Sequence, residues 1–193
     1  MKLAAIPGIA PVSMRSVDGT AAALTELIVS VRGPESAHDP GVALAARDAA
    51  EMAHAGGAGL VAVVAHAQAD PGILVGMVVT SDVPLGPDAA ADLRYYLEDV
   101  GGSDIREVTE SRTERGYPVV IAERLLLPGP PTAGCQLQAV VVDPGGRRMG
   151  VFTLHSTTGR GWLELATVLG QLVSSVDFSV APNDPRMRVA TRT

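Results

Sequence analysis

Short apolar stretches recur along this chain, some continuous and some alternating with polar residues, and both patterns are typical of β-strands. Glycine, proline and aspartate separate most of these stretches, as expected of turns. Strands are therefore predicted at residues 24–31, 60–67, 73–80, 104–113, 117–127, 136–142 and 149–155, with a short extended segment at 176–180.

Turn residues join several of these strands into hairpins. Residues 70–72 read Asp-Pro-Gly, and residues 143–146 read Asp-Pro-Gly-Gly, which is the clearest hairpin signal in the chain. The stretch 104–113 carries charges of both signs, and such charges discourage a strand from pairing with other chains. We therefore expect an antiparallel sheet with residues 104–113 at an exposed edge.

Three other stretches place apolar residues three and four positions apart, which predicts amphipathic helices at residues 42–54, about 88–100, and 162–173. Asp39 before Pro40 is expected to cap the first helix. The glycine-rich residues 56–59 follow this helix, so they predict its C-terminal end and not a phosphate-binding loop, which precedes a helix. Ser156, Thr157 and Thr158 are expected to cap the last helix.

These elements indicate an α+β fold with an antiparallel sheet of about six strands and three helices, a content that also allows an αβα sandwich. The length of 193 residues fits one domain. Residues 1–19 mix proline with turn formers and predict an irregular N-terminal arm, residues 20–180 a single α+β domain, and residues 181–193 a flexible tail.

Composition excludes several classes of function. Apolar residues make up 47% of the chain, which is enough to build a core from aliphatic side chains, and aromatic residues only 3%. The net charge of −6 opposes binding to nucleic acid or to an anionic membrane surface. The longest apolar stretch, residues 59–67, is far shorter than the ~20 residues that span a membrane, so no membrane insertion is expected.

The single cysteine, Cys135, cannot form an intramolecular disulfide. Prolines and glycine interrupt the N-terminal apolar residues before the core of a signal peptide could form. Both features predict a cytoplasmic protein.

No motif in the sequence predicts a catalytic, cofactor-binding or metal-binding residue, so none of these sites is expected and no cofactor is implied. The only lysine is Lys2, which excludes a P-loop. The serine-nucleophile motif GxSxG does not occur. The histidines show none of the local spacings that bind metals; they are His38, His54, His66 and His155.

A cysteine–histidine pair is the one alternative chemistry that the residues leave open. His66 and His155 lie near predicted strand ends, where either could meet Cys135 or Glu123 and form an activated nucleophile. A lone cysteine is more often a small buried apolar residue. The position of Cys135 relative to His155 decides between the two interpretations.

Two exposed features could contact a partner. Arg147 and Arg148 lie in a predicted turn, where guanidinium groups are usually solvated but can also recognise carboxylates. Tyr95 lies on the second predicted helix, away from its apolar stripe of Leu93, Tyr96, Leu97 and Val100.

Residues 116–178 have the order strand, loop, strand QLQAVVVD, glycine turn, strand MGVFTLHS, helix WLELATVLGQLV and SSVDF. This order resembles the C-terminal half of the PsbP-like family, whose members are αβα sandwiches. The resemblance covers about a third of the chain and implies a non-enzymatic binding or accessory module, and similar bacterial proteins occur around specialised secretion machinery. It transfers no functional residue.

The sequence thus favours a cytoplasmic accessory module that binds another protein through a sheet edge or a helix face. The alternative is a small hydrolase or transferase that uses Cys135, His66 or His155. Self-association is a third hypothesis, because a sheet rich in valine and alanine with an unpaired edge can pair with its own copy.

Overall fold

The computed structural model describes residues 1–100, 102, 104–126 and 134–179. They form one seven-stranded sheet in the order β1-β2-β3-β7-β6-β5-β4, and all neighbouring strands are antiparallel. The strands are β1 (Ile9–Pro11), β2 (Leu60–Val64), β3 (Gly72–Thr80), β4 (Ile105–Arg112), β5 (Pro118–Leu126), β6 (Gly134–Val142) and β7 (Arg148–Ser156). The helices are α1 (Val17–Arg32), the short 3-10 helix η1 (Pro34–His38), α2 (Pro40–Ala55), α3 (Ala89–Val100) and α4 (Trp162–Ser174).

This content confirms the predicted α+β class, with slightly more strands and helices than expected. The predicted hairpins form, since β2 pairs with β3 and β6 pairs with β7. The charged strand β4 lies at the edge of the sheet, as predicted. The side chain of Asp39 accepts a hydrogen bond from the N–H of Gly41, at 2.9 Å, and so caps α2; Gly56 ends the same helix.

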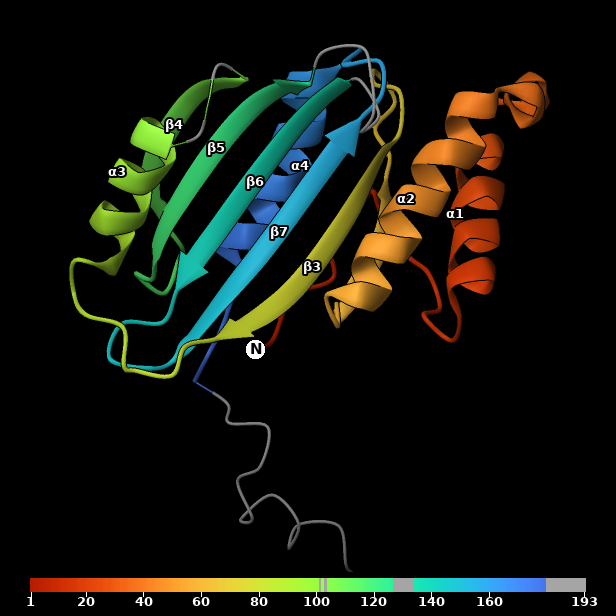
Figure 1. Ribbon diagram of the computed structural model, residues 1–193. Helices are drawn as coiled ribbons and strands as arrows, with labels where there is room; N and C mark the ends of the chain where they lie inside the picture. The colour runs from red at the N-terminus through yellow and green to blue at the C-terminus, as the bar shows by residue number, and fades with distance from the viewer. Residues whose placement is uncertain (101, 103, 127–133, 180–193) are drawn as a thin grey trace, which may run out of the picture.

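The helices lie on the two faces of the sheet (Figure 1). One face carries α1 and α2, which pack on β2 and β3, and also α3, which packs on β4, β5 and Val142 of β6. The other face carries α4, together with Met1, Leu3 and Ile6 of the N-terminal segment. The result is a three-layer αβα arrangement.

The core beneath α4 contains the largest fully buried side chains of the protein, among them Phe152, Leu154, Leu165 and Leu169. Each such side chain contributes about 1.5–3 kcal/mol through burial of its apolar surface. The core beneath α2 is instead rich in alanine, and this lets α1 and the sheet approach the helix closely; its buried alanines are Ala45, Ala46, Ala49 and Ala53.

The strand predicted at residues 24–31 is wrong, because these residues belong to α1. The helix buries Thr20, Leu24 and Ile28, which recur at a helical spacing of four, and leaves Val31 45% exposed. Ser16 accepts a hydrogen bond from the N–H of Gly19 and so begins the helix upstream of the apparent strand.

The first nineteen residues are more regular than the predicted arm. Ile9–Pro11 forms β1, Lys2 pairs with Asp177, and α1 begins at Val17. The predicted flexible tail at residues 181–193 lies outside the described residues.

The predicted cap of α4 by Ser156, Thr157 and Thr158 is also wrong. The N-cap is Gly161, which has a positive φ of 68° and makes no side-chain capping bond. Ser156 and Thr158 accept hydrogen bonds from backbone N–H groups two or three residues later, within the loop itself. The intervening glycines allow this loop to turn before the helix starts.

Arg148 is not solvated as expected. Its guanidinium donates to Asp143 at 3.0 Å and to the carbonyl oxygen of Phe178 at 2.8 Å, and it lies over the Phe178 ring. Arg148 therefore ties the β6–β7 turn to the chain that follows α4.

Candidate functional site

The central strands β6 and β7 have one face that the helices of the described chain cover only in part: α3 packs on Val142 at one end of β6, and β7 and the other end of β6 are less covered. Figure 1 shows this face between α3 on one side and α2 on the other, with α4 behind the sheet. The side chains on the two faces differ accordingly: Ala139, Phe152 and Leu154, which face α4, are at most 1% exposed. On the opposite face Val140 and Val142 are also buried, but six residues are only half-buried, and we call these the open face: Gln136, Gln138, Met149, Val151, Thr153 and His155.

Polar side chains form two rows across one end of the open face. Gln136 lies between Arg124 of β5 and His155 of β7, and in the next row Gln138 lies beside Thr153. The other end is apolar, because Met149 and Val151 pair with Val79 and Met77 of β3, respectively. An antiparallel sheet can leave one face to solvent and carry polar residues there, and these polar rows lie where neither α2 nor α3 covers the sheet.

A cavity of about 330 Å³ lies at the polar end, between α2 and the sheet. Asp48 and Met52 of α2 form one wall, Thr153 and His155 form part of the floor, and Arg124 lies opposite. Apolar walls with a few converging polar groups are typical of binding sites.

Arg124 keeps part of its hydrogen-bonding capacity at this cavity. Its Nη1 lies 3.5 Å from Oδ2 of Asp104. Its Nε is buried and has no hydrogen-bond partner within the described part of the chain. The guanidinium can therefore donate to a ligand that enters the cavity.

The wall formed by α3 presents an exposed aromatic ring. Arg94 bonds Glu98 at 2.9 Å and approaches Glu110 of β4 at 3.6 Å, so this side of the helix faces the sheet edge. Tyr96 is about 160° away around the helix and therefore lies on the side toward β6. It is 60% exposed, so the prediction that it belongs to the buried stripe of α3 is wrong; Tyr95 is exposed as expected.

Carboxylates border the open face on both sides. Asp48 and Asp104 line the cavity. Asp92 and Asp99 lie four residues before and three residues after Tyr96, so they occupy the same side of α3. Both are exposed.

The structure does not bring Cys135 and His155 together. Cys135 pairs with Ser156, and its neighbour Gln136 pairs with His155, so the thiol and the imidazole lie on opposite faces of the sheet. Burial raises the pKa of the Cys135 thiol, and the nearby carboxylate of Glu123 raises it further. The sulfur thus favours the protonated, unreactive form.

Glu123 and the remaining histidines have other roles or positions. Glu123 accepts a hydrogen bond from Trp162 Nε1 at 2.8 Å, which fixes the start of α4. His54 Nε2 lies 3.0 Å from the hydroxyl of Thr20, which links α2 to α1. His38 is exposed. Among the described residues, no group of three or more histidine, cysteine or acidic side chains is placed to hold a metal ion.

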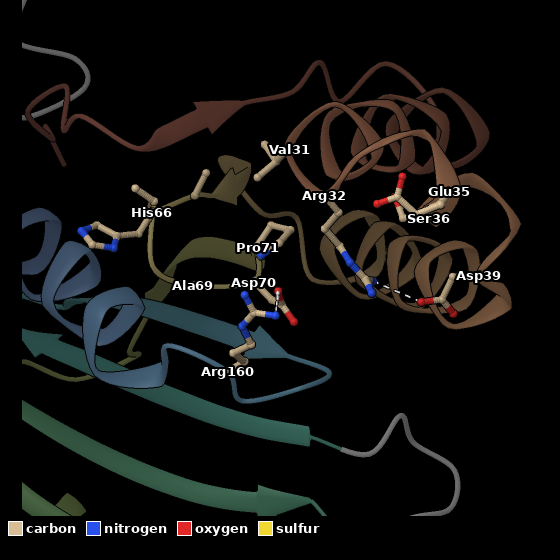
Figure 2. Close-up of a pocket in the computed structure, with 12 residues that line it drawn as sticks. Val31, Arg32, Glu35, Ser36, Asp39, His66, Ala69, Asp70, Pro71 and Arg160 are labelled. Atoms are coloured by element: carbon tan, nitrogen blue, oxygen red, sulfur yellow. Dashed lines mark hydrogen bonds and ion pairs between the residues drawn. The ribbon is translucent and has the colours of Figure 1, made fainter.

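A larger cavity, of about 720 Å³, opens between the end of α1, η1 and the loop from β2 to β3 (Figure 2). Its charged groups pair locally: Arg32 with Asp39 at 3.1 Å, and Arg160 with Asp70 at 3.9 Å. Figure 2 shows His66 lying apart from Arg32 and Asp39. Because these groups do not converge on one point, the cavity is a weaker candidate than the open face.

Comparison with known proteins adds no assignment. The chain matches no protein-family model, and it matches no curated protein. Within the described residues, no helix has the length and apolar character required to cross a membrane.

The sequence contains a signal for the open face that functional motifs do not reveal. Polar residues alternate with apolar ones at Gln136 and Gln138 before the hairpin turn, and at Thr153 and His155 after it. Counting outward from the turn places them opposite one another on one face. This residue count does not show where α2 and α3 pack on the sheet.

Proposed function

We propose that this chain is a non-enzymatic binding module that holds a segment of another protein on the open face between α2 and α3. The single observation that carries the proposal is that β7 is half-buried on the open face, at Met149, Val151, Thr153 and His155, and buried on the α4 face, at Phe152, Leu154 and Ser156. Helices cover both sides of this face (Figure 1), and the half-buried surface left between them is suited to a partner.

The spacing of the elements favours a helical partner. Helix α2 packs on β3, and α3 packs on β4, β5 and the Val142 end of β6, which leaves β7 and residues 136–138 of β6 less covered. Two strands at about 4.8 Å each span about 10 Å, which is the diameter of an α-helix with its side chains. A partner helix would complete the layer that α2 and α3 begin.

The position of Cys135 supports a binding role over the alternative of a cysteine-dependent hydrolase or transferase, because His155 lies on the opposite face of the sheet from the thiol and cannot activate it. The cytoplasm and an accessory role beside bacterial secretion machinery are parts of this proposal. The first is supported by the single cysteine and the second only by the PsbP-like resemblance.

Site-specific photocrosslinking tests the proposal. A benzophenone amino acid is placed at Gln138 on the open face and, as the matched control, at the exposed Gln171 on α4. The full chain is expressed in its native host and illuminated. We expect an adduct with another protein at position 138 and none at 171, with the attached peptide mapping to a helical segment. Equal labelling at both positions, or no intermolecular adduct at 138, would overturn the proposal. An adduct with a second copy would replace it with self-association.

A further inference from the structure

We propose that the segment held on the open face is a basic amphipathic helix, an inference that rests on the proposed function and specifies the chemistry of the partner. Its apolar stripe would contact the centre of the open face, and its lysine or arginine side chains would reach the carboxylates on both walls. The argument depends on the placement of charge, of apolar surface and of hydrogen-bonding groups.

The charge on the two walls is predominantly negative. Asp48 of α2 and Asp104 line the cavity, and Asp92 and Asp99 are exposed on α3, on the side of Tyr96. Arg124, which also lines the cavity, lies beside Asp104. Complementary charges on a partner would fix its position and speed its association.

The centre of the open face supplies apolar contacts of an adaptable kind. Met52 on α2 is 49% exposed and Val79 on β3 is 38% exposed. Met77 and Val151 lie between them on the same face of the sheet. Methionine side chains adjust to irregular shapes and are common on surfaces that receive amphipathic helices.

The cavity of about 330 Å³ offers a place for one large apolar anchor of the partner helix. Ile73 and Val75 line it below, and Thr153 and Gln136 can donate or accept hydrogen bonds at its edge. Helices docked in grooves are usually held by a few such anchors at intervals of three or four residues.

Two synthetic 18-residue helices with the same leucine stripe test the inference, one with lysine and the other with glutamate at the polar positions. Each carries a fluorescent label, and its dissociation constant for the full chain is measured by fluorescence anisotropy. We expect the leucine–lysine helix to bind in the micromolar range and more weakly as salt rises, and the leucine–glutamate helix to bind at least about tenfold more weakly.

Matched variants locate the binding. Asp48→Asn combined with Asp92→Asn neutralises one carboxylate on each wall, and Asp82→Asn combined with Glu114→Gln removes the same charge from exposed sites elsewhere. Because one exposed ion pair changes affinity by about twofold to fivefold, the wall variant should weaken the lysine helix by about fivefold or more. The control should leave it nearly unchanged. Equal weakening by both variants would overturn the inference, because it would indicate attraction to net charge alone.

The variant Gln138→Trp, which fills the open face, separates this inference from the proposed function. If the glutamate helix binds as well as the lysine helix and Gln138→Trp abolishes both, the basic partner is wrong and the open face remains a docking surface. If the lysine helix binds equally well to Gln138→Trp, both proposals are wrong. If neither helix binds the unmodified chain, the basic helix is overturned, and the photocrosslinking result decides the proposed function.

Discussion

The open face and the α4 face of β7 should respond very differently to mutation, and adjacent residues provide the comparison. Thr153 points to the open face and is half-buried, whereas Leu154 points to α4 and is fully buried. If the open face is kept for a partner, its polar side chains contribute little to folding. We therefore expect Thr153→Val to leave the free energy of unfolding almost unchanged and Leu154→Ala to lower it strongly.

The magnitudes follow from burial. Valine has the shape of threonine and is equally suited to a strand, so the change at Thr153 should lie within about 1 kcal/mol of zero and can be stabilising. Leu154 packs with Leu74, Phe152 and Leu165 in the core beneath α4. Truncation there leaves a cavity and costs about 2–5 kcal/mol. For a chain of this length, that lowers the melting temperature by roughly 4–20 °C.

Urea unfolding followed by circular dichroism measures both variants, with the slope of the transition as a check that each unfolds in the same manner. A loss of about 2 kcal/mol or more for Thr153→Val would refute the reasoning. The threonine would then belong to a packed interior, and the open face would not be free to receive a partner.

Further predictions concern the thiol, a pH-sensitive carboxyl and a glycine. Cys135 should react with iodoacetamide at neutral pH more slowly in the folded protein than after unfolding, because burial raises its pKa; mass spectrometry measures the rate, and faster reaction in the folded state would contradict this. Hydrogen bonds from Ser179 lower the pKa of Asp177, with a smaller contribution from Arg115. The stabilisation from Asp177 is therefore complete above the ordinary aspartate pKa of about 4 and is lost as the pH falls through the lower folded value. The stability difference between the native chain and Asp177→Asn should shrink over that range in pH-dependent unfolding, and a constant difference would argue against it. Gly161→Ala should destabilise the protein by more than about 2 kcal/mol in thermal unfolding, because φ is +68° and the new Cβ would lie 2.4 Å from the Cα of Ala69. Gly57→Ala, with a similar φ of +62° but open space around it, should cost only about 1–2 kcal/mol, and equal losses would contradict the steric argument.

The elements that the sequence predicted correctly are those in which local patterns and tertiary packing agree. The helix α2 has both a capping aspartate and an apolar stripe, and the β6–β7 hairpin has both alternation and turn residues. At residues 24–31 the local pattern and the packing disagree. The alternation over this short stretch is typical of a strand, but the buried residues Leu24 and Ile28 are four positions apart and belong to a helix that begins upstream. The three-residue strand β1 is too short to give a pattern at all, and it exists because β2 offers it a partner.

The candidate site was harder to predict from the sequence, because it is the part of the sheet that the helices leave half-buried. The alternation at Gln138 and Thr153 could have placed polar groups on one face, and the pairing register then excludes a contact between Cys135 and His155. Whether that face is buried depends on the docking of α2 and α3, which are distant in the sequence from the strands concerned. No local pattern carries that information.

The edges of the sheet explain why binding is more reasonably assigned to its face. The outer strand β4 carries exposed charges at Arg106, Glu107 and Glu110, which oppose pairing with another strand. The other edge strand, β1, has three residues and ends at Pro11, which has no N–H to donate. Both edges are therefore poor templates for strand addition, which favours the open face as the site of the proposed partner. The polar rows of Gln136, Gln138, Thr153 and His155 make this face compatible with water when no partner is bound.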